Sequence, residues 1–411
     1  MKKKKQGWRF KGNEIDYLKD LLSKDFAAGD ASTYNERLEQ LFAKKHNQKY
    51  AITANSGTST LHMALNAFGV GHGDEVILPA LTVTLCGFAI WQCGAVPVYA
   101  DVKQDTFLID PEDIKKKITQ KTKAIMVVHL YGLMADMSSI KKIAKENNLY
   151  ILEDSAQCFL GRDEKNRISG ASSDVGSWSF ENTKHITTGD GGIVTTNNQK
   201  IAENMRKFAS AGYKNLTAKT GRIRIDRSKF QNPNWFRHEM FGYNYRLSEI
   251  CAAVGLAQLE RINFFLQKRR KMGSLFLKTI KLSKSDLLVP QKTTKKQFHT
   301  YYTFACVFNG QKYGIKWEDF RLKFMSYGGD GIYAAWKLVS DEKPFKEGRL
   351  KGLKSGSMKL TNSYGWGKSP IAKELQKKLM QFTTNQNNYS EMLKQVNALK
   401  KTLNFFKTKT Q

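Results

Sequence analysis

Short apolar segments alternate with helix-like segments between about residues 27 and 210, and this alternation limits the possible folds more than any other feature of the chain. Strands are expected at 50–53, 76–78, 96–100, 124–129, 149–153, 175–180 and 192–196. Helices are expected at 59–68, 85–93, 111–118, 138–147 and 201–210. Apolar strands separated by helices are typical of a parallel sheet that is covered on both faces. The sequence therefore predicts an α/β fold with a mostly parallel sheet.

The chain changes in character after about residue 262. A helix-like segment at 247–267 ends the first part, and beyond it the chain becomes richer in lysine and contains a strand-like segment at 301–307. We therefore predict two domains. A large α/β domain with an N-terminal arm would occupy residues 1–262, and a smaller α+β domain would occupy residues 263–411.

The net charge of +30, from 67 Lys and Arg against 37 Asp and Glu, would suit a nucleic-acid or anionic-membrane partner. The basic residues are dispersed, however, and their densest runs are typical of solvated faces. The uncharged segment 76–100 contains prolines and glycines, and it fits two buried strands around a short helix better than a membrane-spanning helix. We expect neither a nucleic acid nor a membrane as a partner.

The five cysteines are widely spaced and include no C-x-x-C pair. This pattern disfavours both a disulfide framework and a zinc ribbon. We therefore expect a cytoplasmic protein without a bound metal.

Polar residues follow several of the expected strands, where parallel sheets bind their ligands. One group places Gly57, Thr58 and Ser59 at a strand-to-helix turn, whose N–H groups and hydroxyls could bind an anion. An ordinary helix cap would use the same residue types. A second group places Asp154 and Gln157 after a strand, where the carboxylate could pair with a cationic ring nitrogen, bind a metal or cap a helix.

Two further groups lie later in the chain. Lys184 stands in a turn between two expected strands, close to Ser179 and to several glycines. A lysine in such a turn can act as an amine nucleophile or a base, although most lysines are solvated surface residues. Asn244 and Arg246 precede a helix rich in small residues, where either could bind phosphate or cap the helix.

The order and spacing of these four groups closely resemble the DegT/DnrJ/EryC1/StrS family of pyridoxal-phosphate-dependent sugar aminotransferases. The resemblance runs from about Ala28 to Phe405 and includes matching segments at 77–79, 97–101, 129–132 and 252–259. It implies the aspartate-aminotransferase (fold type I) architecture and pyridoxal 5'-phosphate as cofactor, with pyridoxamine phosphate during turnover. It also implies L-glutamate as donor, a nucleotide-linked keto sugar as acceptor, and a homodimer with shared active sites.

The resemblance also assigns roles to single residues. Lys184 matches the lysine that binds the cofactor covalently and moves a proton, Asp154 the partner of the pyridine nitrogen, and Gln157 a residue near the ring hydroxyl. The other implied cofactor contacts are Gly57, Thr58, Ser59, Val83, Ser179 and Asn244, the last from the neighbouring subunit. Val83 departs from the family, which usually has an aromatic ring stacked on the cofactor at this position. An aliphatic side chain can still pack against the cofactor ring, but it offers less dispersion area.

Substrate contacts are expected mainly in the irregular basic segment at 214–240, which lies near the substrate in the family. Guanidinium groups there could grip a nucleotide diphosphate, although the segment could equally be an extra solvated loop. The expected substrate-binding residues are His185, Arg222, Arg224, Trp235 and Arg237.

A lysine at position 184, where related dehydratases have histidine, favours transamination over dehydration. The run 187–192 looks more like that of enzymes that aminate C4 of a 4-keto-6-deoxy sugar nucleotide, for surface polysaccharides or amino sugars. Two alternatives stay open, namely an aminotransferase for another cyclic ketone such as an inosose, and a non-catalytic nucleic-acid-binding regulator on the same scaffold.

Overall fold

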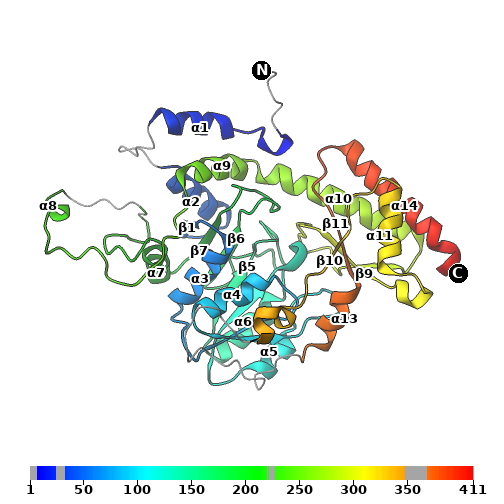
Figure 1. Cartoon of the computed structure of the whole chain (residues 1–411), viewed down its shortest axis with the longest axis horizontal. Coiled ribbons are helices and arrows are strands. Elements are labelled where there is room, and N and C mark those ends of the chain that lie inside the picture. The colour runs from blue at the N-terminus through cyan, green and yellow to red at the C-terminus, as the bar shows by residue number, and fades with distance from the viewer. Residues whose placement is uncertain (1–6, 25–32, 220, 222–226, 348–367, 411) are drawn as a thin grey trace.

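The computed structural model describes residues 7–24, 33–219, 221, 227–347 and 368–410 (Figure 1). Its larger part is built on a seven-stranded sheet in the order β1-β7-β6-β5-β4-β2-β3. Only β7 runs antiparallel to its neighbours, β1 and β6, and all other pairs are parallel. This confirms the mostly parallel sheet. The strands are β1 (Tyr50–Ala54), β2 (Glu75–Pro79), β3 (Val96–Ala100), β4 (Thr122–Val128), β5 (Tyr150–Asp154), β6 (Val175–Ser179) and β7 (Gly192–Thr196).

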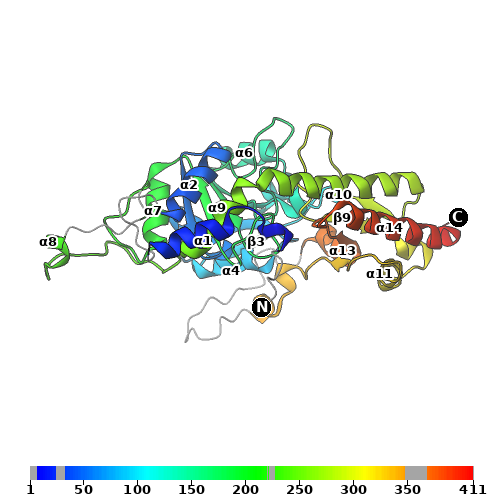
Figure 2. The ribbon, with the colours of Figure 1, turned by 90° about the horizontal axis from the view of Figure 1, so that it is seen from above.

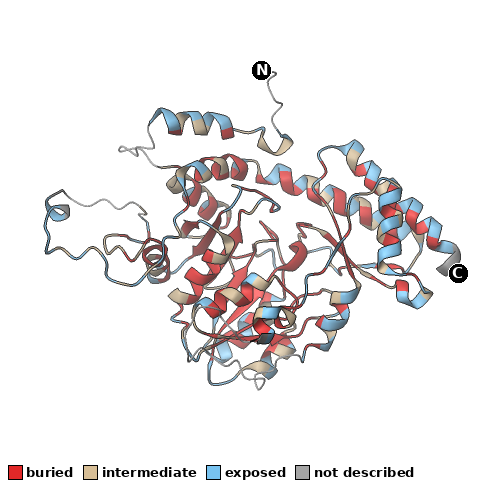
Figure 3. Cartoon of the chain, in the orientation of Figure 1, coloured by how far each residue is buried: buried red, intermediate tan, exposed pale blue. Residues whose placement is uncertain are grey.

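Helices cover both faces of this sheet. Every residue of β2, β6 and β7 is buried, which requires cover on both sides because side chains alternate between the two faces of a strand (Figure 3). Trp178 and Ile193 share one hydrophobic cluster with side chains of α2 and α9. The helices of the larger part are α1 (Glu14–Ser23), α2 (Tyr34–Lys45), α3 (Gly57–Ala67), α4 (Thr84–Gln92), α5 (Pro111–Lys117), α6 (Met137–Glu146), α7 (Gln199–Ala209), α8 (Arg227–Phe230) and α9 (Glu249–Glu260).

A smaller α+β part follows, with its own antiparallel sheet in the order β10-β11-β9-β8. Its strands are β8 (Leu288–Pro290), β9 (Phe304–Phe308), β10 (Tyr333–Ala334) and β11 (Leu379–Phe382). Its helices are α10 (Ile262–Ser283), α11 (Trp317–Ser326), α12 (Lys343–Glu347), α13 (Pro370–Lys378) and α14 (Tyr389–Thr410). The 3-10 turns of the chain are η1 (Trp8–Phe10), η2 (Leu130–Gly132), η3 (Gly310–Tyr313) and η4 (Val339–Asp341).

The segment expected to be helical at 247–267 is helical in the structure, as two helices that meet at Arg261, and the second continues to Ser283. The second one, α10, is long and lies beside α14 (Figure 2). Its first turns place Phe265 and Leu266 in the cluster that contains Trp178, and its later turns place Phe276 in the core of the smaller part. The domain boundary at 262/263 stays a prediction, and it coincides with the start of a helix that packs on both parts.

Candidate active site

Asp154 is the last residue of β5, at the carboxyl ends of the parallel strands, where such sheets bind ligands. Its side chain is 4% exposed. Its Oδ1 accepts a hydrogen bond from the Ala156 N–H at 3.0 Å, and its Oδ2 accepts one from the Cys86 thiol at 3.3 Å. Burial and the charge of Asp154 raise the pKa of Cys86 well above its usual value, so the thiol keeps its proton and remains a donor. The structure therefore holds a carboxylate in a buried position with one defined orientation.

Lys184 lies in the turn between β6 and β7 and is 9% exposed. Its Nζ lies 4.9 Å from the ring centroid of Tyr302, in a cation–π contact. The positive charge of Lys184 acts on the pKa of Cys86 against the charge of Asp154, so both charges lie close to one buried thiol. Tyr302 was not anticipated from the sequence, because nothing in the local pattern separates it from core tyrosines.

The N-terminus of α3 forms a cradle beside β6. Ser56 caps the helix by accepting from the Ser59 N–H at 3.1 Å, and the first helical residues are Gly57 and Thr58. A Cβ on Gly57 would lie 2.7 Å from the Cβ of Ser179, so only glycine allows this approach. Free N–H groups at a helix N-terminus next to a serine hydroxyl suit a phosphate group. The hydroxyl of Ser59 donates a hydrogen bond to Asn55 Oδ1 at 2.7 Å.

Gln157 supplies an unused donor at the same edge. Its Oε1 accepts from the Tyr131 N–H at 2.8 Å, whereas its Nε2 is buried without a hydrogen-bond partner among the described residues. A buried amide donor without an acceptor indicates that a bound group completes the site. A carboxylate, a buried lysine, a helix N-terminus and this amide together fit pyridoxal phosphate, which carries a pyridine nitrogen, an aldehyde, a phosphate and a ring hydroxyl.

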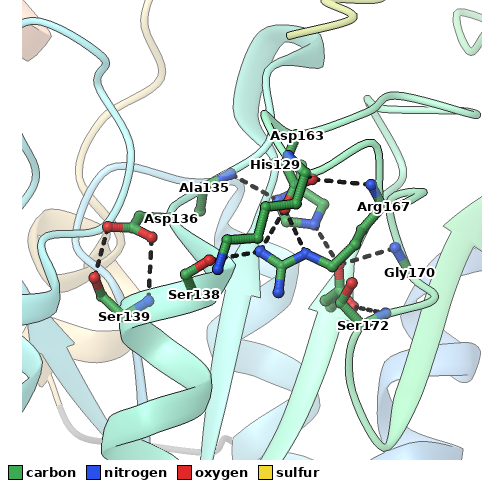
Figure 4. Close-up of polar contacts among 11 residues, drawn as sticks. His129, Ala135, Asp136, Ser138, Ser139, Asp163, Arg167, Gly170 and Ser172 are labelled. Carbon is green, nitrogen blue, oxygen red and sulfur yellow. Dashed lines mark hydrogen bonds and ion pairs between the residues drawn. The ribbon is translucent and has the colours of Figure 1, made fainter. Parts of the chain in front are cut away.

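A buried polar network includes His129, which directly follows β4 (Figure 4). His129 Nε2 lies 2.7 Å from Glu153 Oε2, and neither side chain is exposed. His129 Nδ1 accepts from the Ala135 N–H at 3.2 Å, which leaves Nε2 as the donor to Glu153. Burial raises the pKa of Glu153, but the hydrogen bonds from His129 and from the Gly170 N–H outweigh burial and lower it. The backbone N–H of His129 bonds the carbonyl of Asp154 at 3.0 Å, so the network fixes the strand end.

Two other expected contacts lie near these groups or within the core. Val83 is the N-cap of α4, the helix that carries Cys86, and it is half-buried. His185 is 1% exposed and packs between Phe159 and Tyr302, with ring centroids 5.3 and 5.9 Å away. Its ring is enclosed by these neighbours, and its expected substrate contact stays a prediction.

Asn244 is exposed, in a segment whose backbone pairs with residues 208–211. The next residue, Tyr245, accepts a hydrogen bond from the Asn55 N–H at 2.7 Å, so the segment borders the start of α3. The Tyr245 hydroxyl lies 3.0 Å from His62 Nδ1 on that helix. Three large apolar side chains around this segment are exposed, namely Phe236, Phe241 and Tyr243.

The basic segment at 214–240 extends beyond α7, and α8 marks its outer end in Figure 1. The ring of Trp235 lies 4.5 Å from Lys214 Nζ, and the carbonyl of Arg237 accepts from the Lys214 N–H at 3.0 Å. Arg222 and Arg224 lie outside the described residues. These two contacts join the beginning of the segment to its later part.

In the described ranges no helix combines the length and apolar character needed to cross a membrane. Nor do the described residues contain a group of three or more His, Cys, Asp or Glu side chains that could hold a metal ion.

A mostly parallel seven-stranded sheet followed by a smaller α+β part is the architecture of the fold type I aminotransferases. The structure of an aminotransferase from Psychrobacter cryohalolentis aligns with a TM-score of 0.82 and 26% identity, over 95% of this chain and 96% of that one. The chain belongs to the DegT/DnrJ/EryC1/StrS aminotransferase family, whose model matches residues 9–320.

GDP-perosamine synthases from several bacteria are among the relatives of this chain. A GDP-perosamine synthase from Escherichia coli O157:H7 is 37% identical over 291 residues, which are 71% of this chain and 74% of that protein. A GDP-perosamine synthase from Vibrio cholerae is 32% identical over 300 residues, which are 72% of this chain and 75% of that protein. The family named from the sequence is thereby confirmed.

Proposed function

We propose that this chain transfers the amino group of L-glutamate to C4 of a GDP-linked 4-keto-6-deoxy sugar, with pyridoxal phosphate bound at Lys184. The observation that carries the proposal is the meeting of Lys184, Asp154 and the α3 cradle at one sheet edge, in a chain related to two GDP-perosamine synthases. The five cysteines are free in the structure, which supports a cytoplasmic location.

The roles of the residues follow from their chemistry. When bound, pyridoxal phosphate supplies an electron sink for the carbon that loses or gains the proton. Asp154 pairs with the pyridine nitrogen and keeps it protonated, because an adjacent carboxylate favours the charged form. Lys184 holds the cofactor covalently between turnovers, and its released amine moves the proton at the substrate carbon. The N–H groups of Gly57 and Thr58, with Ser179, hold the phosphate while the covalent bond is broken.

The active protein is proposed to be a homodimer in which Asn244 reaches the phosphate of the neighbouring subunit. Phe236 is 81% exposed and Phe241 76%, both close to Asn244 in sequence. Large apolar side chains this exposed are typical of surfaces that bind a partner. Trp235 and Arg237, together with Arg222 and Arg224, would then grip the nucleotide diphosphate from the segment at 214–240.

The cofactor is tested first. Purified protein should absorb at about 410–430 nm, and borohydride should fix the cofactor to Lys184. Lys184→Ala should abolish the covalent product, while Lys200→Ala, which removes an exposed lysine at the start of α7, should leave it intact. A colourless protein that pyridoxal phosphate cannot reconstitute would exclude the enzyme.

The acceptor is tested by incubating UDP-, GDP- and dTDP-linked 4-keto-6-deoxyhexoses with L-glutamate and measuring 2-oxoglutarate. We expect the GDP-linked sugar to be the preferred acceptor.

The names of two other relatives match the two alternative functions. An L-glutamine:2-deoxy-scyllo-inosose aminotransferase from Streptomyces kanamyceticus is 33% identical, so release of product with an inosose and without any nucleotide would identify a cyclic-ketone enzyme. A pleiotropic regulatory protein from Geobacillus stearothermophilus is 34% identical, and a regulator would bind nucleic acid and show no turnover with any donor.

A further inference from the structure

Two arginines hold the turn that carries Lys184. Arg9 Nη1 donates to the carbonyl of Asn182 at 2.6 Å, and its Nη2 donates to the carbonyl of Lys184 at 2.7 Å. Arg269 Nη2 donates to the carbonyl of Thr183, which lies between them, at 3.2 Å. Three consecutive carbonyls around the reactive lysine are therefore bonded to guanidinium groups from two distant parts of the chain.

Arg9 is itself held in place by α9. Its carbonyl accepts from Gln258 Nε2 at 2.7 Å and from Arg261 Nη1 at 3.0 Å. Gln258 also donates to Glu14 at the start of α1, so the N-terminal arm is anchored both at Arg9 and at Glu14. Burial lowers the pKa of Arg9, while the charge of Glu181 raises it, and the guanidinium stays protonated at neutral pH. The arm thus delivers a fixed cation to the lysine turn.

Arg269 comes from α10 and is 5% exposed. Its Nη1 donates to the carbonyl of Tyr302 at 2.7 Å and to Thr384 Oγ1 at 3.1 Å. Burial lowers the pKa of Arg269 to about 10, which still leaves it charged at neutral pH. One guanidinium therefore joins the lysine turn to the residue whose ring lies under the lysine amine.

We propose that Arg9 and Arg269 are positioning residues for Lys184, and that the N-terminal arm is a working part of the active site. This inference rests on the proposed role of Lys184. A turn with three carbonyls in fixed bonds has one backbone conformation, and this directs the side chain of Lys184 toward the cofactor. Loss of the Arg9 bonds would let the turn rotate, and small misplacements of a reacting group reduce rate far more than binding.

The test uses the full chain and three variants. Arg9→Gln removes both bonds and the charge, and Arg9→Lys keeps the charge but loses the two-pronged geometry. Arg37→Gln is the matched control, because Arg37 also serves the N-terminal region, where its guanidinium lies 4.9 and 4.8 Å from the rings of Tyr17 and Tyr34. Five quantities are measured: cofactor fixed by borohydride, kcat, KM for L-glutamate, amide hydrogen exchange and the melting temperature.

We expect Arg9→Gln to lower kcat about tenfold or more while KM for L-glutamate stays within about twofold. Amide exchange should accelerate at 181–188 in the cofactor-free protein and stay unchanged elsewhere. Arg9→Lys should be intermediate, and Arg37→Gln should match the wild type.

A wild-type kcat in Arg9→Gln would overturn the inference. So would a loss of kcat that follows a general rise in exchange and a lower melting temperature, because that pattern shows a structural role alone. If Arg9→Gln does not fold, Arg9→Lys decides by the same comparison of kcat with KM. A wild-type protein that borohydride does not label would refute the proposed role of Lys184 instead.

Discussion

The thiol of Cys86 donates a hydrogen bond to Asp154 at 3.3 Å, so a neutral buried donor faces the carboxylate that would meet the cofactor. Cys86→Ala removes this donor and leaves the carboxylate less well solvated. We expect the cofactor-free protein to lose about 1–3 kcal/mol of unfolding free energy beyond the effect of volume alone, measured by urea denaturation. Cys306→Ala is the control for volume, since Cys306 is equally buried in the core of the smaller part. Equal losses in the two variants would show that the thiol hydrogen bond contributes nothing.

Gly57→Ala should weaken cofactor binding without unfolding the protein. The added Cβ would lie 2.7 Å from the Cβ of Ser179, which forces the α3 N-terminus away from β6. We expect the dissociation constant for pyridoxal phosphate to rise about tenfold, in line with the loss of one charged hydrogen bond or more. Titration of the cofactor-free protein, followed by absorbance, gives this constant. Gly71→Ala is the control, because a Cβ there meets no atom within 4 Å, and unchanged binding in Gly57→Ala would argue against a phosphate cradle.

Glu153→Gln should destabilise the protein at neutral pH and should do so less in acid. Because the pKa of Glu153 is lower in the folded state, its contribution is present above its unfolded pKa, near 4.5, and is lost as the pH falls through the folded value. Urea denaturation should show a loss of roughly 1–3 kcal/mol at pH 7 that shrinks below about pH 4.5. Glu112→Gln, at an exposed site on α5, should change little at either pH. A loss independent of pH would show that the ionised form of Glu153 does not account for it.

His185→Gln should flatten the acid side of the stability profile. Burial lowers the pKa of His185 well below 6.5, so the unfolded chain takes up a proton below that pH which the folded chain cannot. Stability from this residue is therefore complete above about pH 6.5 and falls below it, by about 1.4 kcal/mol per pH unit. Between pH 6 and pH 5, the unfolding free energy of the variant should therefore fall less steeply with pH than that of the wild type, by about this amount. An unchanged slope would mean that His185 becomes protonated in the folded protein.

Mixed dimers test whether the active site is shared. Lys184→Ala and Asn244→Ala subunits, each inactive alone, should regain up to about one quarter of wild-type activity when mixed, since random pairing restores one intact site in half of the dimers. Turnover of L-glutamate after co-refolding measures this recovery. No activity above that of the two parents, with Asn244→Ala itself inactive, would place Asn244 outside the site of the neighbouring subunit.

The sheet was predictable from the sequence because its strands are buried on both faces and appear as continuous apolar runs. The residues at strand ends, such as Asp154 and Lys184, were predictable for a related reason, since the topology decides where they lie. Arg9, Arg269 and Tyr302 were not, because they reach Lys184 from parts of the chain far apart in sequence, and in a chain with 67 basic residues a buried arginine has no local signature.

The continuity of α10 has a mechanical consequence. One unbroken helix contributes side chains to both hydrophobic clusters and carries Arg269, which grips the lysine turn. If the smaller part moves to admit a substrate, α10 has to move with it. Because Arg269 on this helix is hydrogen-bonded to the carbonyl of Thr183, that movement would displace the lysine turn. Movement of the smaller part and the alignment of the Lys184 amine are therefore coupled.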